Sequence, residues 1–367
     1  MILGIDVSTY FEELNDGAIY KDKAGNEVSP LDNFIKNGVD YMRIRLWVDP
    51  YYENKPYLGG TCDLDNFIKL SKLSLEKGFK IILDFHYSDF WADPGKQFIP
   101  KAWQNLTKDE LVLKVYEYTK DVLLTLKKNN ISLYGIQIGN EITNGMLWPI
   151  GKLIDDGKEV RSNYENLIEL INSGIKASRE IYKDSKIILH LERSTDNKVY
   201  REFFFKMKEA NVDYDIIGTS YYPFYHGSIE KLMFNLLDIK NTFNKKIMIM
   251  ELGYAFTTED YQKDGQDQLV LNSNFENNQD NYIPYPFTEE GQSLFIERLL
   301  KECKENKIDG VFYWEPLWIP GKNIHWTSLE GQDYINEKVK STRNEWANQA
   351  LYDYNGVELL GLNSFRK

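Results

Sequence analysis

Apolar runs rich in β-branched residues recur along the chain, each followed by an amphipathic stretch, and no other feature limits the possible folds as strongly. We expect strands at residues 2–7, 39–47, 79–85, 134–139, 186–191, 215–220, 246–251 and 309–314. Helices are expected at residues 31–37, 63–77, 107–128, 163–182, 197–209, 228–243 and 288–306, with residues 343–360 closing the chain. Strands that alternate with helices pair in parallel, so the pattern predicts a single-domain (β/α)8 TIM barrel of the α/β class over residues 1–367. A doubly wound open sheet is the alternative, but no glycine-rich phosphate loop follows the first strand.

The composition favours a neutral ligand. The chain carries 44 Lys and Arg against 56 Asp and Glu, a net charge of −12, which argues against nucleic acid or an anionic membrane as a partner. No apolar run is long enough to span a membrane, and Met1 leads directly into the first strand without a signal peptide. We therefore expect an intracellular protein or a mature form with an added start Met. We also expect a monomer in which Cys62 and Cys303 are free thiols.

Two of the expected strands end in a glutamate. The run Tyr134–Gly139 is followed by Asn140 and Glu141, and the run that begins at Lys246 ends in Glu251. In a (β/α)8 barrel the active residues lie at the carboxyl ends of the strands, so the two carboxylates should face each other across the mouth of the barrel. Glycoside hydrolysis needs such a pair. The simpler interpretation is that each glutamate caps a helix or forms a structural ion pair.

The other strand ends carry residues that suit sugar chemistry. Arg45 can hold one carboxylate ionised, Asn140 can bond a sugar 2-hydroxyl, and Trp314 can form the floor under a sugar ring. Each also has a purely structural interpretation. Arg43 and Arg45 can pair with carboxylates inside the barrel, Trp314 can belong to the core, and His86 can orient its loop without touching a ligand.

The motifs around these strand ends resemble those of family 53 of the glycoside hydrolases, the arabinogalactan endo-β-1,4-galactanases. The resemblance runs essentially from end to end, and it is carried by residues 4–8, 45–50, 84–94, 137–141, 145–149 and 312–319. Residues 348–353 are similar to the closing helix of that family.

The resemblance implies a role for each matching residue. Glu141 would be the general acid/base and Glu251 the nucleophile of a retaining, endo-acting hydrolase of β-1,4-galactan, with the two carboxyl groups ~5 Å apart. The implied substrate-binding residues are Arg45, His86, Asp89, Trp91, Asn140, Tyr222, Trp314 and Trp318. The family also implies secretion.

One segment departs from the family. Residues 251–255 read Glu-Leu-Gly-Tyr-Ala, whereas the family usually has Glu-Thr-x-Tyr-Pro, so this loop is expected to take another path. Bacterial members often hold a structural calcium nearby, for which Asp264 and Asp267 are the candidate ligands here. Calcium prefers six to eight oxygen ligands, and few are present. No cofactor is expected for catalysis.

Three alternatives stay open. A retaining barrel glycosidase of the mannanase, cellulase or xylanase type would share the glutamate pair. A metal-dependent hydrolase could use His86, His190 and His226, although such sites need several converging ligands around an open position. A non-catalytic sugar-binding barrel would keep the groove without the chemistry.

Overall fold

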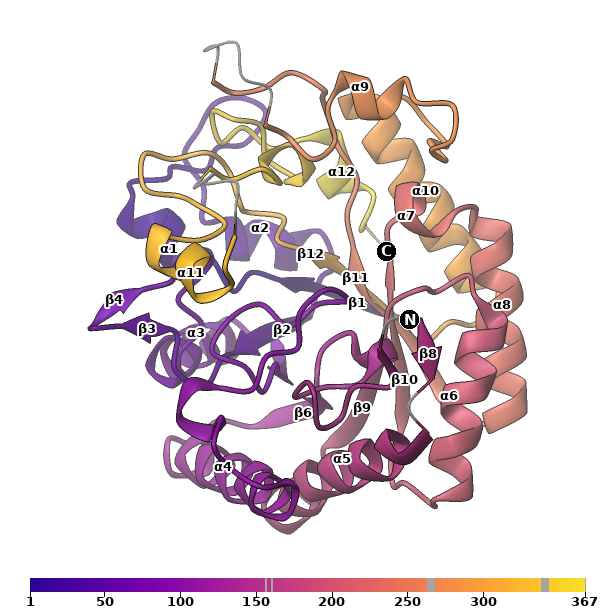
Figure 1. The fold of residues 1–367 in the computed structure, drawn as a ribbon. Coiled ribbons are helices and arrows are strands. Elements are labelled where there is room, and N and C mark those ends of the chain that lie inside the picture. Colours follow the sequence, from indigo (N-terminus) through magenta and orange to yellow (C-terminus); the bar gives the residue numbers. More distant parts are fainter. Residues whose placement is uncertain (156, 160, 263–267, 338–342, 367) are drawn as a thin grey trace.

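The computed structural model describes the chain except for residues 156, 160, 263–267, 338–342 and 367. Eight parallel strands close into a barrel in the order β1-β12-β11-β10-β9-β6-β5-β2, which confirms the predicted (β/α)8 fold (Figure 1). The strands are β1 (Ile2–Asp6), β2 (Tyr41–Leu46), β5 (Lys80–Phe85), β6 (Leu133–Ile138), β9 (Lys186–Leu191), β10 (Ile216–Tyr221), β11 (Lys246–Leu252) and β12 (Gly310–Trp314).

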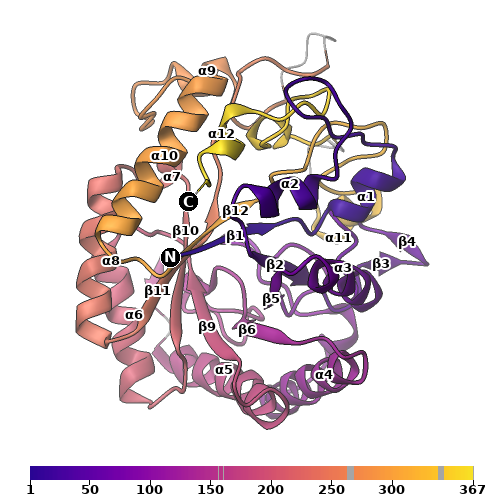
Figure 2. The same cartoon turned by 180° about the vertical axis from the view of Figure 1, so that it is seen from behind.

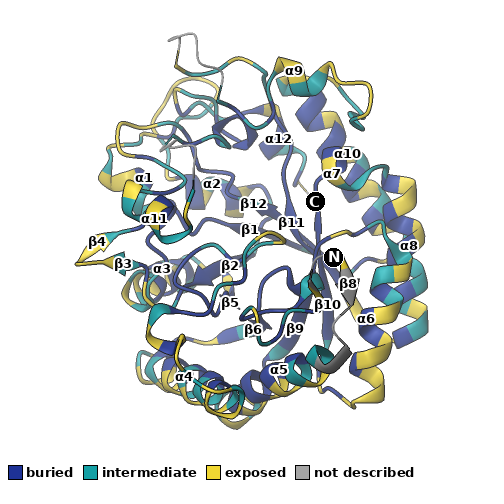
Figure 3. Cartoon of the chain, in the orientation of Figure 1, coloured by how far each residue is buried: buried dark blue, intermediate teal, exposed yellow. Residues whose placement is uncertain are grey.

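Helices surround the barrel, as the view from behind also shows (Figure 2). They are α2 (Pro30–Lys36), α3 (Leu64–Glu76), α4 (Lys108–Lys128), α5 (Arg161–Ile181), α6 (Asn197–Glu209), α8 (Ile229–Phe243) and α10 (Glu289–Glu305). Their faces toward the barrel are buried and their outer faces are exposed (Figure 3). Helix α4 begins with a capping box in which Thr107 and Glu110 satisfy each other's backbone N–H groups. In the described part of the chain, no helix has the length and apolar composition needed to cross a membrane.

Shorter elements lie in the loops and were not predicted. They are the helices α1 (Tyr10–Asn15), α7 (Pro223–His226), α9 (Ser273–Glu276), α11 (Leu329–Tyr334) and α12 (Leu360–Asn363), and the hairpins β3–β4 (Tyr51–Tyr52, Lys55–Pro56) and β7–β8 (Ile154–Asp155, Lys158–Glu159). The expectation of a closing helix over residues 348–353 was wrong, because only a 3₁₀ turn, Ala347–Gln349, forms there. Asn348 and Gln349 are buried in this turn. Cys62 and Cys303 are buried free thiols, as expected.

The barrel interior has an apolar layer below a charged one. Side chains alternate along a strand, so Tyr41, Arg43 and Arg45 of β2 point inward. The alternate residues Met42, Ile44 and Leu46 face the helices. Tyr41 belongs to a small buried apolar cluster completed by Ile82, Ile188, Ile216, Met248, Met250 and Phe312. The layer above it holds the buried Asp6, Arg43, Arg45, Asp84 and Gln137. This charged layer forms the floor of the site described next.

Candidate active site

Backbone geometry positions the two glutamates. Strand β6 ends in a turn in which Gly139 has φ +78° and Glu141 has φ +50°. A Cβ atom on Gly139 would lie 2.7 Å from Ile142 Cγ2, so glycine is required there for space as well as for conformation. A left-handed Glu141 costs about 1–2 kcal/mol, and it turns the glutamate out of the strand direction.

Glu251 is set by an irregularity in the sheet. Between β10 and β11 the register shifts, so that Thr219 pairs with Ile249 but Ser220 pairs with Glu251. The extra residue, Met250, points into the apolar cluster of the barrel. Bulges of this kind change the direction of a side chain, and they are common next to active sites. The shift brings Glu251 to the top of the barrel.

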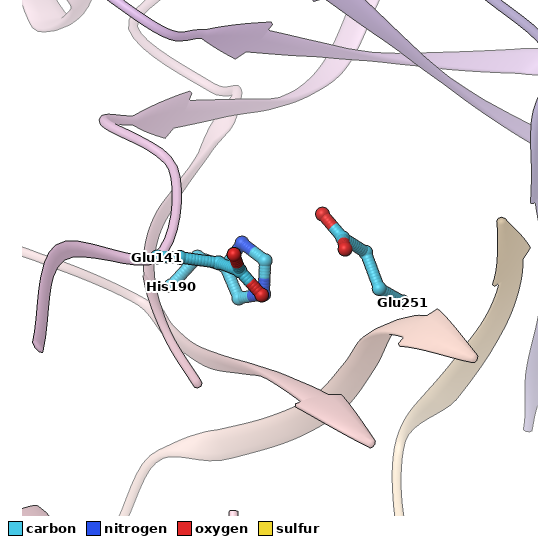
Figure 4. A group of neighbouring side chains, drawn as sticks. All are labelled: Glu141, His190 and Glu251. Atoms are coloured by element: carbon cyan, nitrogen blue, oxygen red, sulfur yellow. The ribbon is translucent and has the colours of Figure 1, made fainter. Parts of the chain in front are cut away.

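The glutamates point toward each other, as predicted. Oxygen atoms of Glu141 and Glu251 and a ring nitrogen of His190 all lie within 4.8 Å of one another (Figure 4). Carboxyl groups about 5–5.5 Å apart characterise retaining glycosidases, whereas inverting enzymes leave room for a water between more distant groups. The arrangement therefore fits attack by one carboxylate while the other transfers a proton.

Two donors hold the carboxylate of Glu251. Arg43 NH1 donates to Oε1 at 3.0 Å, and the Tyr222 hydroxyl donates to Oε2 at 3.0 Å. Burial raises the pKa of Glu251, whereas Arg43 and Tyr222 oppose that rise. The sequence had suggested Arg45 for this role, and that was wrong. Arg45 instead pairs with Asp6 and Glu315, because it lies one inward position farther along β2.

Glu141 has a different environment. Its Oε1 lies 2.6 Å from Ser220 Oγ, and no cation contacts it among the described residues. Burial, followed by the charges of Glu251 and Glu192, raises the pKa of Glu141 well above its ordinary value. Of these two neighbouring carboxyl groups, the surroundings of Glu141 favour the protonated form, whereas the donors at Glu251 favour the ionised form.

Arg43 uses all of its donors in this layer. Its Nε donates to Gln137 Oε1 at 3.1 Å, NH1 serves Asp6 and Glu251 at 3.0 Å each, and NH2 serves Asp84 and Asn140 at 2.7 Å each. The guanidinium thus connects Glu251 to Asn140, the residue beside Glu141.

Asn140 and His86 line the cavity above the pair. Asn140 Nδ2 donates one hydrogen to Ala92 O at 2.8 Å, which leaves its second N–H for a ligand hydroxyl. His86 Nδ1 accepts from Ala92 N at 3.0 Å and from Trp47 Nε1 at 3.2 Å, so Nε2 carries the proton that is donated to Asp84. Both ring nitrogens of His86 are engaged, so it orients its loop and offers a ligand only its ring edge.

Aromatic residues form much of the wall of this cavity of about 480 Å³. Trp91 and Trp314 line it as predicted, 6.0 Å apart between ring centroids, and Arg45 lies over Trp91 at 4.4 Å. Trp318 also borders the cavity but is only 1% exposed, so in this conformation it supports the other two indoles and cannot stack on a sugar face. Tyr222 lies at the floor beside Glu251.

Asp89 does not line the cavity. Its carboxylate is buried, accepts hydrogen bonds from the backbone N–H groups of Asp49 and Lys101, and pairs with the Lys101 ammonium at 3.0 Å. The predicted substrate contact is therefore wrong, and Asp89 instead fastens the loop that carries Trp91.

Several residues of the cavity were not predicted. They are Asp93, Lys96, Glu192, Tyr225, Val270, Trp326, Glu337, Glu345 and Trp346, together with His226 and the flanking Ala92 and Pro94. Most of them lie in long loops whose course the sequence does not reveal. Glu192 is the exception, because it directly follows the buried strand β9 just as Glu141 and Glu251 mark the ends of β6 and β11. Burial raises the pKa of Glu192 to about 7.

The metal candidates gain no support from the described residues. Asp264 and Asp267 lie outside them, and the nearby Asp260 is paired with Arg343 at 3.3 Å. Within the described part of the chain, His86, His190 and His226 form no common cluster. His190 instead adjoins the two glutamates, and its ring nitrogens are hydrogen-bonded to Asn140 and Ser220.

The chain forms a parallel (β/α)8 barrel, and two carboxyl groups from different strands lie close together in a cavity walled by tryptophans. This fold and this site are those of the retaining glycoside hydrolases. Comparison with known proteins specifies the family. The chain belongs to glycosyl hydrolase family 53, whose model matches residues 2–365.

Relatives and solved structures agree with this assignment. The chain is 32% identical to the endo-beta-1,4-galactanase of Bacillus subtilis, over all of this chain and 85% of that protein. It is 33% identical to arabinogalactan endo-beta-1,4-galactanase A of Aspergillus niger, over 86% of this chain and 85% of that protein. The family 53 catalytic domain of Ignisphaera aggregans matches with a TM-score of 0.88 at 34% identity, covering 100% of this chain and 95% of that one. A fungal beta-1,4-galactanase matches with a TM-score of 0.77 at 28% identity, covering 100% of this chain and 99% of that one.

Proposed function

We propose that this protein is a retaining endo-β-1,4-galactanase that cleaves internal linkages of β-1,4-galactan, including the galactan of type I arabinogalactan. The observation that carries the proposal is the pair of glutamate oxygens within 4.8 Å at the floor of a tryptophan-walled cavity. The galactanase names of relatives that align over 86% or more of this chain support the substrate.

In the first step Glu251 attacks the anomeric carbon of the sugar. Arg43 and Tyr222 keep this carboxylate ionised and aligned. Glu141 gives its proton to the departing glycosidic oxygen, so the C–O bond breaks while a covalent glycosyl ester forms on Glu251. Asn140 is available to bond the 2-hydroxyl as positive charge develops at the anomeric carbon.

In the second step water replaces Glu251 at the anomeric carbon. The ester carries no charge, so the repulsion that kept Glu141 protonated is weaker in the intermediate. Glu141 is then ionised and takes a proton from the attacking water. The C–O bond to Glu251 breaks, the sugar keeps its original configuration, and both carboxyl groups return to their starting states.

Substrate specificity is tested by products. We expect soluble oligosaccharides of several lengths from potato galactan early in the reaction, and no products from mannan, cellulose or xylan. Release of oligosaccharides from mannan, cellulose or xylan, with galactan left intact, would instead favour the alternative glycosidases that share this fold. Proton NMR of the first product should show the β-anomer.

Catalysis by two carboxyl groups requires no metal, and we propose that none takes part. Full activity on galactan after exhaustive treatment with a chelator supports this, whereas loss of kcat that Zn²⁺ restores would contradict it. We also propose that the protein acts as a monomer, which sedimentation at the assay concentration can test.

A further inference from the structure

A short hydrogen-bonded chain connects the acid/base glutamate to a buried histidine. Glu141 Oε1 lies 2.6 Å from Ser220 Oγ, and Ser220 Oγ lies 2.9 Å from His190 Nε2. His190 Nδ1 lies 2.8 Å from Asn140 Oδ1. All four side chains are at least nine-tenths buried, so these atoms have to satisfy one another.

The amide of Asn140 fixes the tautomer of His190. Its Nδ2 donates to Ala92 O, and its Oδ1 accepts from Arg43, so the atom facing His190 is an acceptor. Nδ1 of His190 must therefore carry a hydrogen and donate it.

Gln137 does not change this assignment, although its Nε2 is 3.2 Å from His190 Nδ1. Its Oε1 accepts from Arg43, which fixes the amide orientation. Its two N–H groups have better acceptors in the carboxylate of Asp84 and the carbonyl of Gly139. The Nδ1 hydrogen of His190 therefore goes to Asn140.

His190 is neutral in this environment. It is fully buried, and the charged or titratable groups near it are Arg43 of β2, His86 beyond β5, and the carboxyl groups of Glu141 and Glu251, which have oxygens within 4.8 Å of one of its ring nitrogens. Burial first, and then Arg43 and His86, lower the pKa of His190 well below its ordinary value. A neutral ring with hydrogen on Nδ1 has a lone pair on Nε2, so Nε2 accepts a hydrogen bond.

Ser220 has one hydrogen to give. If it donates to Nε2 of His190, its oxygen is free to accept, and the chain is complete only when Glu141 is protonated and donates to Ser220. If it donates to an ionised Glu141, its lone pairs face the lone pair of Nε2 at 2.9 Å, and that nitrogen is left without a donor.

We propose that His190, acting through Ser220, is a positioning residue that holds the hydrogen of Glu141 on Oε1 and favours the acid form of that glutamate before the glycosidic bond breaks. This role rests on the proposed hydrolysis. It gives Glu141 a preference for the acid form that does not depend on the charge of Glu251. When Glu141 has released its proton, the Ser220 hydroxyl turns to the carboxylate and leaves Nε2 of His190, which favours return of the proton in the second step.

Other groups also act on Glu141, and the test has to hold them constant. They are the carboxyl groups of Glu251 on β11, Glu192 after β9 and Asp93 after β5, and the phenols of Tyr222 and Tyr200. None of them contacts Ser220 or His190 through a hydrogen bond among the described residues. Substitutions at Ser220 and His190 therefore change the hydrogen bonds that link Glu141 to His190 and leave these charges in place.

The sign of one pH shift tests the proposal. In Ser220→Ala we expect the basic limb of the kcat/KM profile on galactan to move to lower pH by about one unit, because the acid form of Glu141 loses its hydrogen-bond acceptor. If Ser220 served only as a donor to the ionised form, its removal would move the limb to higher pH, and that result would overturn the proposal. Ser71→Ala is the matched control, since Ser71 is a buried serine of α3 outside the site.

A second variant tests the histidine. His190→Asn keeps an amide near the position of Nδ1 but lacks Nε2, so we expect a similar shift to lower pH in the wild-type background. In the Ser220→Ala background the same substitution should cause no further shift. An equal shift in both backgrounds would show that His190 does not act through Ser220.

A readout without turnover separates this proposal from the proposed function. The infrared carbonyl band of the protonated Glu141, assigned by its absence in Glu141→Gln, should titrate at lower pH in both variants. That result stands even if galactan is not the substrate. An unchanged titration in folded Ser220→Ala protein overturns the proposal by itself.

Discussion

Replacing Arg43 with lysine should damage both stability and catalysis, although the positive charge remains. Arg43 makes five hydrogen bonds, one through Nε, two through NH1 and two through NH2. A lysine ammonium can take the place of NH1 or of NH2, but not of both, because it is a compact charge on an unbranched stem. Whichever place it takes, three of the five bonds are lost.

The expected losses follow from those bonds. At about 1–1.5 kcal/mol for each buried bond, Arg43→Lys should lower the free energy of unfolding by about 3–5 kcal/mol. Glu251 and Asn140 are held by different nitrogens of Arg43, so one of them loses its donor. A hydrogen bond to a charged group contributes about 1.5–3 kcal/mol, which corresponds to a fall in kcat of about 10- to 150-fold.

Arg45→Lys is the matched control. Arg45 reaches Asp6 and Glu315 through a single nitrogen, NH1, and uses NH2 only for Gly59 O at 3.3 Å. Lysine can replace the NH1 contacts, so we expect a loss of about 1 kcal/mol in urea unfolding. Equal unfolding free energies for the two lysine variants, or a kcat for Arg43→Lys within threefold of wild type, would refute this reasoning.

Three further predictions concern the glutamates and Trp318. With azide, Glu251→Ala should form an α-galactosyl azide and Glu141→Ala a β-galactosyl azide, as NMR of the products can establish; the reverse would exchange the two roles. Glu13 is buried and faces Glu315, Glu12 and Asp16, and its pKa is raised well above the 4.5 of the unfolded chain. Its neutral form therefore stabilises the fold below pH 4.5, and that stability is lost as pH rises through the folded pKa. Glu13→Gln should raise Tm by about 2 °C or more at pH 8 and leave it unchanged at pH 4, where a gain would contradict the argument. Trp318→Phe should raise KM for galactan because Trp91 and Trp314 lose part of the indole that packs against them, while kcat should change less than threefold. An unchanged KM would show that Trp318 does not support these two residues.

Much of the fold could be predicted because barrel strands and helices have local signals. The strand expected at residues 186–191 and the helix expected at 197–209 have the observed ends, and Thr107 caps α4 through the glutamate three residues later. The failures lie where tertiary contacts decide. Residues 348–353 were expected to be helical only because they are similar to the closing helix of the family, but Asn348 bonds the carbonyls of Thr257 and Leu271, and these contacts hold the segment in another conformation.

The site could be predicted only in part for a related reason. A glutamate after a buried strand is a local signal, and it located Glu141 and Glu251. The partner of Glu251 is not local. Arg43 and Arg45 are both inward residues of β2, and only the depth of each in the barrel decides which one reaches Glu251. Asp89 shows the opposite error, since its motif identified the loop but not the direction of the carboxylate.

The two glutamates have the same side chain, so their different roles must come from what surrounds them. Glu251 receives hydrogen bonds from a guanidinium and a phenol, and both favour the ionised form. Glu141 has two carboxyl groups, those of Glu251 and Glu192, as its main charged neighbours, and both favour its protonated form. In the proposed mechanism, esterification of Glu251 removes one of these two charges and leaves that of Glu192, so the preference of Glu141 for its proton weakens at the step in which it acts as a base. The different preferences of the two glutamates therefore follow from the placement of Arg43 beside Glu251 and of Glu192 near Glu141.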